Sequence, residues 1–166
     1  MRRAAVLAGT AALVLSTVAV FAQAKPNFAG KWTMIADPAA PAAGGGRGGG
    51  FGGGLGASAT IAQDEKTLTV TREVQGADVK AVYNLDGSDS KNTMTIGGNA
   101  MDQVSKAKWD GNKLVITTTI NFGGNAAELS TTYSLDATGN LVVETTRPDF
   151  QGGGAPVTVK VTYKKS

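Results

Sequence analysis

The chain has 166 residues, with 16 basic and 13 acidic side chains, 23 glycines, no cysteine and no histidine. Without cysteine there is no disulfide framework, and without either residue there is no structural zinc site, Cys–His pair or Ser-His-Asp triad. No motif assigns catalysis to the carboxylate, lysine, tyrosine and serine side chains that remain. The composition therefore predicts a protein that is not an enzyme, has no catalytic residues, holds no metal and needs no cofactor.

The first 24 residues have the pattern of a secretory signal peptide. A cationic head at residues 2–3 precedes an uncharged, strongly apolar stretch that ends in the small-x-small pattern Ala-Gln-Ala at 22–24. A membrane-spanning anchor is the alternative, because the stretch approaches the roughly 20 residues that a spanning helix needs. The cleavage pattern favours removal, so we expect a secreted or periplasmic protein that begins at Lys25 and is not inserted in a membrane.

Cleavage also changes the charge balance. Without Arg2 and Arg3 the formal net charge falls from +3 to +1, and the only basic run that remains is Lys164-Lys165. A chain this close to neutral lacks the basic surface that nucleic acid binding requires. We therefore expect no nucleic acid partner, and we expect partners that are selected by shape and apolarity.

Beyond residue 24 the sequence alternates apolar and polar residues with the period of two that is typical of β-strands. The first predicted strand covers residues 28–36. A long break at 37–57 follows, in which ten of the thirteen residues from Gly44 to Gly56 are glycine. Because glycine loses more backbone entropy on ordering than any other residue, we expect a flexible loop there.

Nine further strands follow, separated by short polar or glycine-containing turns. They are predicted at 58–63, 67–74, 78–85, 92–96, 101–109, 113–121, 126–135, 140–147 and 156–164. Ten tightly linked strands would leave two exposed edges in an open sheet, and closure removes those edges. The predicted fold class is all-β: one domain over 25–166, an antiparallel up-and-down β-barrel of about 8–10 strands, with no significant helix beyond the signal peptide.

The opening of the first strand, Phe28-x-Gly30-x-Trp32, resembles the first-strand motif of the calycins, which are the lipocalin and fatty-acid-binding-protein barrels. The end of the chain, residues 161–165, resembles the closing strand of the fatty-acid-binding branch. The break at 37–57 departs from that branch, in which two short helices join the first two strands. The chain is also similar to a loose group of exported bacterial proteins of unknown function that open with such a strand and a Gly-rich stretch.

The calycin resemblance implies a lipocalin-like barrel in which Trp32 closes one end. It also implies that a basic residue from the last strands packs over this ring. A glycine at position 30 suits such a place independently, because it lets another backbone or an aromatic ring approach closely. The candidates for the basic residue are Arg147, Lys160 and Lys164.

Arg72 is the main candidate for a ligand-binding residue. It shares a predicted strand face with Leu68 and Val70, and an inward-facing guanidinium needs an anionic partner. The resemblance to fatty-acid-binding proteins implies that this partner is the acidic head of a ligand. The alternative is that Arg72 reaches the rim of the barrel or pairs with an internal acid. Three aromatic residues on apolar strand faces are the other candidate ligand-binding residues, with ordinary core packing as their alternative: Tyr83, Trp109 and Tyr133.

Three other features of the sequence resemble functional motifs but do not predict a binding or catalytic site. Residues 86–90 present closely spaced oxygen ligands but lack the glutamate that an EF-hand loop needs at its twelfth position, so we expect a polar turn. The Gly-rich break lacks the Lys-Ser/Thr ending of a phosphate-binding loop. No pair of carboxylates stands out as a site, because the three glutamates within predicted strands are expected to face outward: Glu73, Glu128 and Glu144.

These observations predict a container. The leading hypothesis is an exported barrel that binds a hydrophobic or amphipathic small molecule, such as a lipid, in its interior. The alternative is a solid barrel, filled by its own side chains, that acts through its surface as an envelope interaction module or an inhibitor.

Overall fold

A computed structural model describes residues 25–35, 54–74, 76–96, 99–122, 125–149 and 154–166. The predicted signal peptide and residues 36–53 of the predicted loop lie outside the described residues. The described ranges contain strands and turns without a helix, so no membrane-spanning helix occurs in them. The strands are β1 (Gly30–Met34), β2 (Ser58–Gln63), β3 (Thr67–Val74), β4 (Ala77–Asn84), β5 (Asp89–Ile96), β6 (Asn99–Asp110), β7 (Lys113–Phe122), β8 (Asn125–Leu135), β9 (Leu141–Arg147) and β10 (Val157–Lys165).

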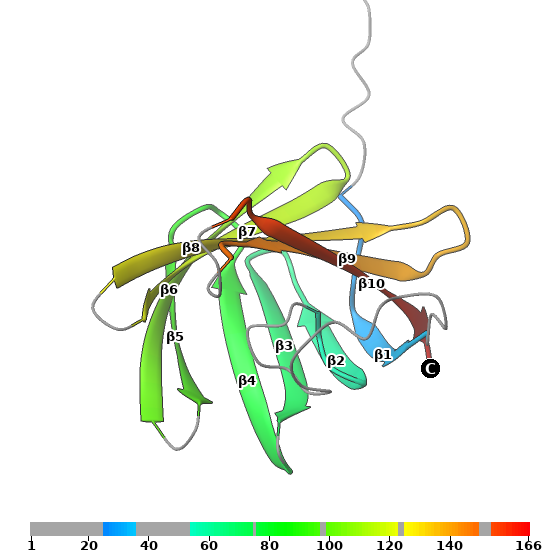
Figure 1. Cartoon of the computed structure of the whole chain (residues 1–166). Coiled ribbons are helices and arrows are strands. Elements are labelled where there is room, and N and C mark those ends of the chain that lie inside the picture. Colours follow the sequence, from blue (N-terminus) through cyan, green and yellow to red (C-terminus); the bar gives the residue numbers. More distant parts are fainter. Residues whose placement is uncertain (1–24, 36–53, 75, 97–98, 123–124, 150–153) are drawn as a thin grey trace, which may run out of the picture.

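The ten strands form one antiparallel sheet in the order β4-β3-β2-β1-β10-β9-β8-β7-β6-β5 (Figure 1). The first and last strands pair directly, with Trp32 opposite Lys165. The sheet curls until its two end strands, β4 and β5, lie side by side, although no backbone ladder joins these two strands. The described chain is therefore a nearly closed up-and-down barrel, which confirms the predicted fold class.

The observed strands agree closely with those predicted from alternation. The strands at 58–63 and 67–74 begin and end where predicted. The largest shift of a single strand end is at β5, which starts at Asp89 and not at 92, and β1 is shorter than predicted by two residues at each end. The turn between β6 and β7 illustrates why glycine-containing segments in the sequence predicted the short connections between strands. Gly111 there has a φ of 58°, a left-handed conformation that glycine adopts without strain, and Asp110 pairs with Lys113 across the hairpin.

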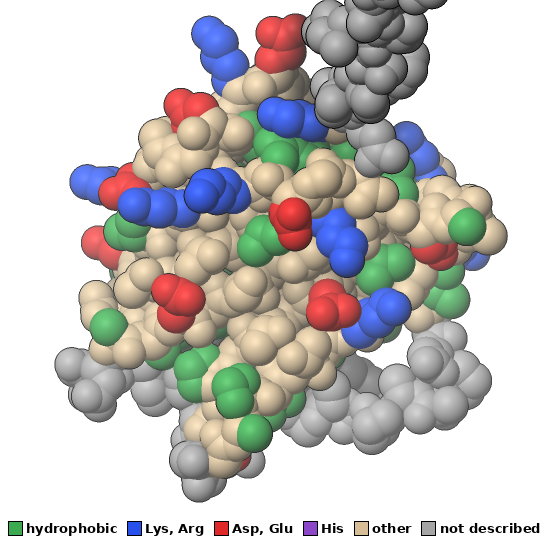
Figure 2. Space-filling view, turned by 90° about the horizontal axis from the view of Figure 1, so that it is seen from above, with side chains coloured by type: hydrophobic (Ala, Val, Ile, Leu, Met, Phe, Trp, Pro, Cys, Tyr) green, Lys and Arg blue, Asp and Glu red, His purple; other side chains and the backbone are tan. Residues whose placement is uncertain are grey.

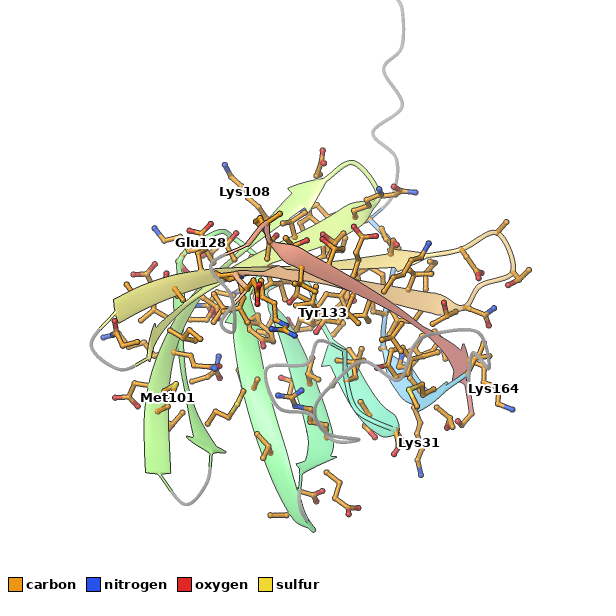
Figure 3. All side chains as sticks on the ribbon, in the orientation of Figure 1. Lys31, Met101, Lys108, Glu128, Tyr133 and Lys164 are labelled. Carbon is orange, nitrogen blue, oxygen red and sulfur yellow. The ribbon has the colours of Figure 1, made fainter. Side chains whose placement is uncertain are left out.

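One half of the barrel interior is filled by large apolar side chains. The Phe28 ring stacks on Trp109 with centroids 5.9 Å apart and an interplanar angle of 11°, and it lies 6.1 Å from the Tyr133 ring. Phe28, Leu68 and Leu114 have no exposed surface. We call Phe28, Leu68, Trp109 and Leu114 the aromatic half. Figure 3 shows Tyr133 among the side chains of the interior.

The Phe28-x-Gly30-x-Trp32 motif has a structural role in this fold. Trp32 is buried, and its Nε1 donates a hydrogen bond to the backbone oxygen of Phe28 at 2.8 Å. The cation over the Trp32 ring is Lys165, with its Nζ 5.6 Å from the centroid. The expectation that Arg147, Lys160 or Lys164 would take this place is wrong, because β10 extends to residue 165 and sets that lysine opposite the tryptophan.

The outer face of the barrel is polar and carries charges of both signs. Glu73, Glu128 and Glu144 are exposed, as predicted. Figure 2 shows Lys and Arg side chains interspersed with Asp and Glu on the face seen from above. On this face the charges do not form a patch of one sign.

Candidate ligand-binding cavity

The half of the interior away from Phe28 contains a cavity of about 100 Å³. We call it the polar cavity, because six of its wall residues present polar side chains to it from inward strand positions: Arg72, Asn92, Gln103, Thr118, Thr131 and Thr145. The remaining wall is largely apolar or aromatic, with Leu55, Val70, Ala81, Tyr83, Met94, Leu129 and Tyr133 among its members. The polar cavity therefore combines hydrogen-bonding groups with carbon surface, which is the usual make-up of a small-molecule site.

Arg72 is a cation inside the barrel without an anionic partner among the described residues. Its side chain is half-buried, and its Nη1 donates a hydrogen bond to the backbone oxygen of Gly54 at 3.2 Å. The ion pair found in the described ranges joins Lys106 and Asp89 on the outer surface, and the cavity wall contains no acidic residue. A guanidinium has five N–H groups, so donors of Arg72 remain for a ligand.

Two tyrosines share the cavity with Arg72. Burial raises the pKa of the Tyr83 hydroxyl above its ordinary value of 10.0, and the nearby positive charge of Arg72 opposes part of this effect. The pKa of Tyr133 is raised as well. Burial is the main cause, and the neighbouring Tyr83 is the second. Both hydroxyls therefore stay protonated at neutral pH. No hydrogen bond between described residues uses either hydroxyl, so both are available as donors to a ligand.

The chain segment just before β2 forms one wall of the cavity. Leu55 is buried, and its backbone N–H donates a hydrogen bond to the Tyr163 hydroxyl at 2.6 Å. Gly54 has a φ of 89°, and a Cβ at this position would lie 2.8 Å from the same hydroxyl oxygen. Glycine is thus required there both by the backbone conformation and by the close approach. Gly54 and Leu55 fall within the predicted flexible loop at 37–57, but in the structure they are packed as wall residues of the cavity.

Three of the four predicted ligand-binding residues meet at this cavity: Arg72, Tyr83 and Tyr133. The fourth, Trp109, lies in the aromatic half, with Lys25 Nζ 5.4 Å from its ring centroid. It borders a separate open surface groove at the other end of the barrel. The structure therefore places Trp109 away from the cavity.

Sequence reasoning missed the uncharged polar residues of the wall. Asn92, Gln103 and Thr118 occupy inward positions of β5, β6 and β7. Alternation contained a signal for two of them, because Thr118 shares a strand face with Leu114, and Gln103 shares one with Trp109. Uncharged polar side chains on a strand do not by themselves mark the interior, because they are usually exposed.

Among the described residues no group of three or more acidic side chains is arranged to hold a metal ion. A comparison with models of known protein families finds no match to the chain, and a search of curated proteins finds none either. The class of the protein therefore rests on its structure. It is an all-β, nearly closed antiparallel barrel of ten strands with an interior cavity, and this architecture is compatible with a calycin-like fold.

Proposed function

We propose that this protein is an exported carrier that binds a small amphipathic molecule through its anionic group in the polar cavity. The observation that carries the proposal is Arg72, a half-buried cation in a cavity whose described wall residues include no acidic side chain. A charge removed from water without a partner is unfavourable, and an anion that enters the cavity relieves that cost. Tyr83 and Tyr133 would add neutral hydrogen-bond donors next to the guanidinium.

The size of the cavity limits what it encloses. Pockets that enclose drug-sized ligands measure roughly 300–1,000 Å³, whereas this cavity measures about 100 Å³. That volume is sufficient for a carboxylate, sulfonate or phosphate group and the few carbon atoms next to it. The apolar wall residues Val70, Ala81 and Leu129 would contact those carbons. A longer ligand would extend out of the cavity.

Membership in the lipocalin or fatty-acid-binding branch of the calycins is part of this proposal. Ten antiparallel strands, the pairing of the first strand with the last, and Lys165 over Trp32 support it. Export of the protein is also proposed, on the signal-peptide pattern of residues 1–24.

The second candidate function is that of a solid barrel that acts through its outer surface. The aromatic half favours it, because Phe28, Leu68 and Leu114 fill that part of the interior completely. In this case the protein would bind no small molecule inside, and the polar cavity would hold only water.

Titration calorimetry with three probes of equal chain length separates the two functions. We expect octanoate to bind, and octanol and octylammonium to bind much more weakly, because only octanoate carries an anion that can pair with Arg72. Hydrogen bonds to charged groups contribute about 1.5–3 kcal/mol, so Arg72→Met should weaken octanoate binding on the order of 10- to 100-fold.

Lys108→Met is the matched control, because it removes a cation from the exposed outer face of β6 (Figure 3). It should leave octanoate binding unchanged. If octanol binds as tightly as octanoate, or if Arg72→Met has no effect, the anchor role of Arg72 is wrong. If none of the three probes binds, the solid barrel is the better description.

A further inference from the structure

The boundary between β4 and β5, here called the seam, is held by side chains and not by a backbone ladder. Asn92 Oδ1 accepts a hydrogen bond from the backbone N–H of Val82 at 2.8 Å, and Asn92 Nδ2 donates one to the backbone oxygen of the same residue at 3.0 Å. Ser90 Oγ accepts from the N–H of Asn84 at 2.7 Å. A carboxamide carries the same donor and acceptor as a peptide group, so Asn92 replaces one rung of a ladder.

The seam is closed at one end only. Its hydrogen bonds lie near the turn at residues 85–88 that connects the two strands. Beyond Val82, towards Ala77, no hydrogen bond between described residues crosses from β4 to β5. Figure 1 shows the two strands diverging in that direction. Asn92 and Val82 therefore form the last closed rung of the seam.

The polar cavity reaches the seam just beyond that rung. Its wall contains three consecutive residues from each side, 79–81 of β4 and 92–94 of β5. Two of them, Lys80 and Thr93, are exposed residues, so the cavity meets solvent between the two strands. Asn92 is both a wall residue of the cavity and the residue that holds the rung.

The other parts of the cavity wall are joined more extensively. The β3–β4 and β5–β6 ladders continue on both sides of the seam from one end of the paired strands to the other. Leu55 is tied to Tyr163, and the far end is filled by the stacked rings of Phe28 and Trp109. Among the strand-to-strand boundaries of the described residues, the β4–β5 boundary is the one without a backbone ladder, so it is the boundary that opens with the fewest backbone hydrogen bonds broken.

We propose that the β4–β5 seam is the route by which a ligand enters the polar cavity, and that Asn92 is the latch that holds it closed. The inference rests on the proposed function, because it needs an anion that binds at Arg72. Beyond that function, it assigns a path of entry and gives Asn92 control of the rate at which the ligand enters.

A reversible cross-link tests the entry route. The chain has no cysteine, so Lys80→Cys with Thr93→Cys introduces the only two thiols, one on each exposed side of the seam. A short bis-methanethiosulfonate reagent would join them, and reduction would release them. The control is Thr119→Cys with Glu128→Cys, an exposed pair that faces each other in the β7–β8 ladder.

The probe is anilinonaphthalene sulfonate, an amphipathic anion whose fluorescence increases on binding, mixed with the protein in a stopped-flow instrument. We expect the seam cross-link to lower the association rate constant by at least about 10-fold, since entry needs local opening. Reduction should restore the rate, and the control cross-link should not change it. An unchanged rate in the seam-linked protein overturns the entry route.

A second measurement tests the latch without any ligand. Asn92→Leu removes both hydrogen bonds to Val82 while keeping a side chain of similar volume. Hydrogen exchange at the Val82 amide should accelerate on the order of 10-fold, while the amide of Thr117 in the β7–β8 ladder keeps its rate. If the variant does not fold, Ser90→Ala should accelerate exchange at Asn84 in the same way. Equal rates in variant and wild type overturn the latch.

The outcomes separate this inference from the proposed function. If the sulfonate binds, Arg72→Met weakens binding, and the seam cross-link leaves the association rate unchanged, then the proposed function stands and the entry route is wrong. If the wild-type protein binds neither octanoate nor the sulfonate, then the proposed function and the entry route are both wrong.

Discussion

The two halves of the barrel interior differ in what fills them. In the aromatic half, Phe28, Leu68 and Leu114 are completely buried, and the Phe28 ring stacks on Trp109. In the other half, the half-buried Arg72 faces a cavity lined by hydroxyl and amide groups. Strands β3, β6 and β7 contribute residues to both halves. The difference teaches that this fold separates the packing that stabilises it from the groups that are available to a ligand.

The largest effect on stability should come from the aromatic half. Phe28→Ala removes a fully buried ring that contacts Trp109 and Tyr133. Phenylalanine-to-alanine changes in cores cost about 3–5 kcal/mol in the free energy of unfolding. Urea unfolding followed by tryptophan fluorescence measures the loss. A cost below about 1 kcal/mol would show that this half is not the main source of stability.

Gly30→Ala should have the next largest effect, at the closed end beside Trp32. Gly30 has a φ of 148°, and an added Cβ would lie 2.5 Å from Cε of Lys165. The strained backbone costs about 1–3 kcal/mol, and the methyl group would displace Lys165 from the Trp32 ring. Thermal unfolding measures the cost.

Lys165→Met serves as the comparison for Gly30→Ala. It removes the cation from Trp32 but leaves the backbone unstrained, so it should cost only about 0.5–1 kcal/mol. Equal losses in the two variants would assign the role of Gly30 to the lysine contact and not to backbone conformation.

Arg72→Met should change stability little, although it weakens anion binding strongly. The variant loses one hydrogen bond to Gly54, but it also removes a half-buried charge that has no acidic partner among the described residues. Apolar replacement of a poorly compensated internal charge is often neutral or stabilising, so the free energy of unfolding should stay within about 1 kcal/mol of the wild type. A loss as large as that of Phe28→Ala would mean that both halves stabilise the fold equally.

The smallest effect at neutral pH concerns the two tyrosines of the polar cavity, Tyr83 and Tyr133. Burial raises the pKa of Tyr83 and Tyr133 in the folded state, with an ordinary value of 10.0 in the unfolded state. Their contribution to stability is complete below pH 10.0 and declines as pH rises above it, because only the unfolded chain then releases these protons.

Urea unfolding at a series of alkaline pH values, together with tyrosinate absorbance, measures this decline. Tyr133→Phe removes one of the two hydroxyls and should make the dependence on pH shallower above pH 10.0. Tyrosinate absorbance that appears at the ordinary pKa while the protein is still folded would contradict the burial of these hydroxyls.

Most of the fold was predictable because strand position depends on local alternation. The run from Thr67 to Val74 alternates strictly, and it forms β3 over the same residues. The inward direction of Arg72 follows from the same alternation, because a strand turns every second side chain to the same face. Tyr83 and Tyr133 were reached by this reasoning as well. Trp109 was placed on the correct face, but at the other end of the barrel from the cavity.

Alternation contains no information about depth along the barrel. Trp109 and Gln103 lie on the same face of β6, yet one packs on Phe28 and the other lines the cavity. Their depth depends on the register between strands, which is set by ladders between distant segments. For the same reason Lys165, and not an earlier basic residue, lies over Trp32.

The sequence by itself determined the ten strands, the turns between them and the identity of the inward face, since these depend on neighbours a few residues apart. Tertiary structure alone decided that Lys165 lies opposite Trp32, that Arg72 has no acidic partner among the described residues, and that β4 and β5 meet at a seam without a ladder. The physical reason is closure. Each of these features depends on how ten strands fit around one interior, and no single strand carries that information.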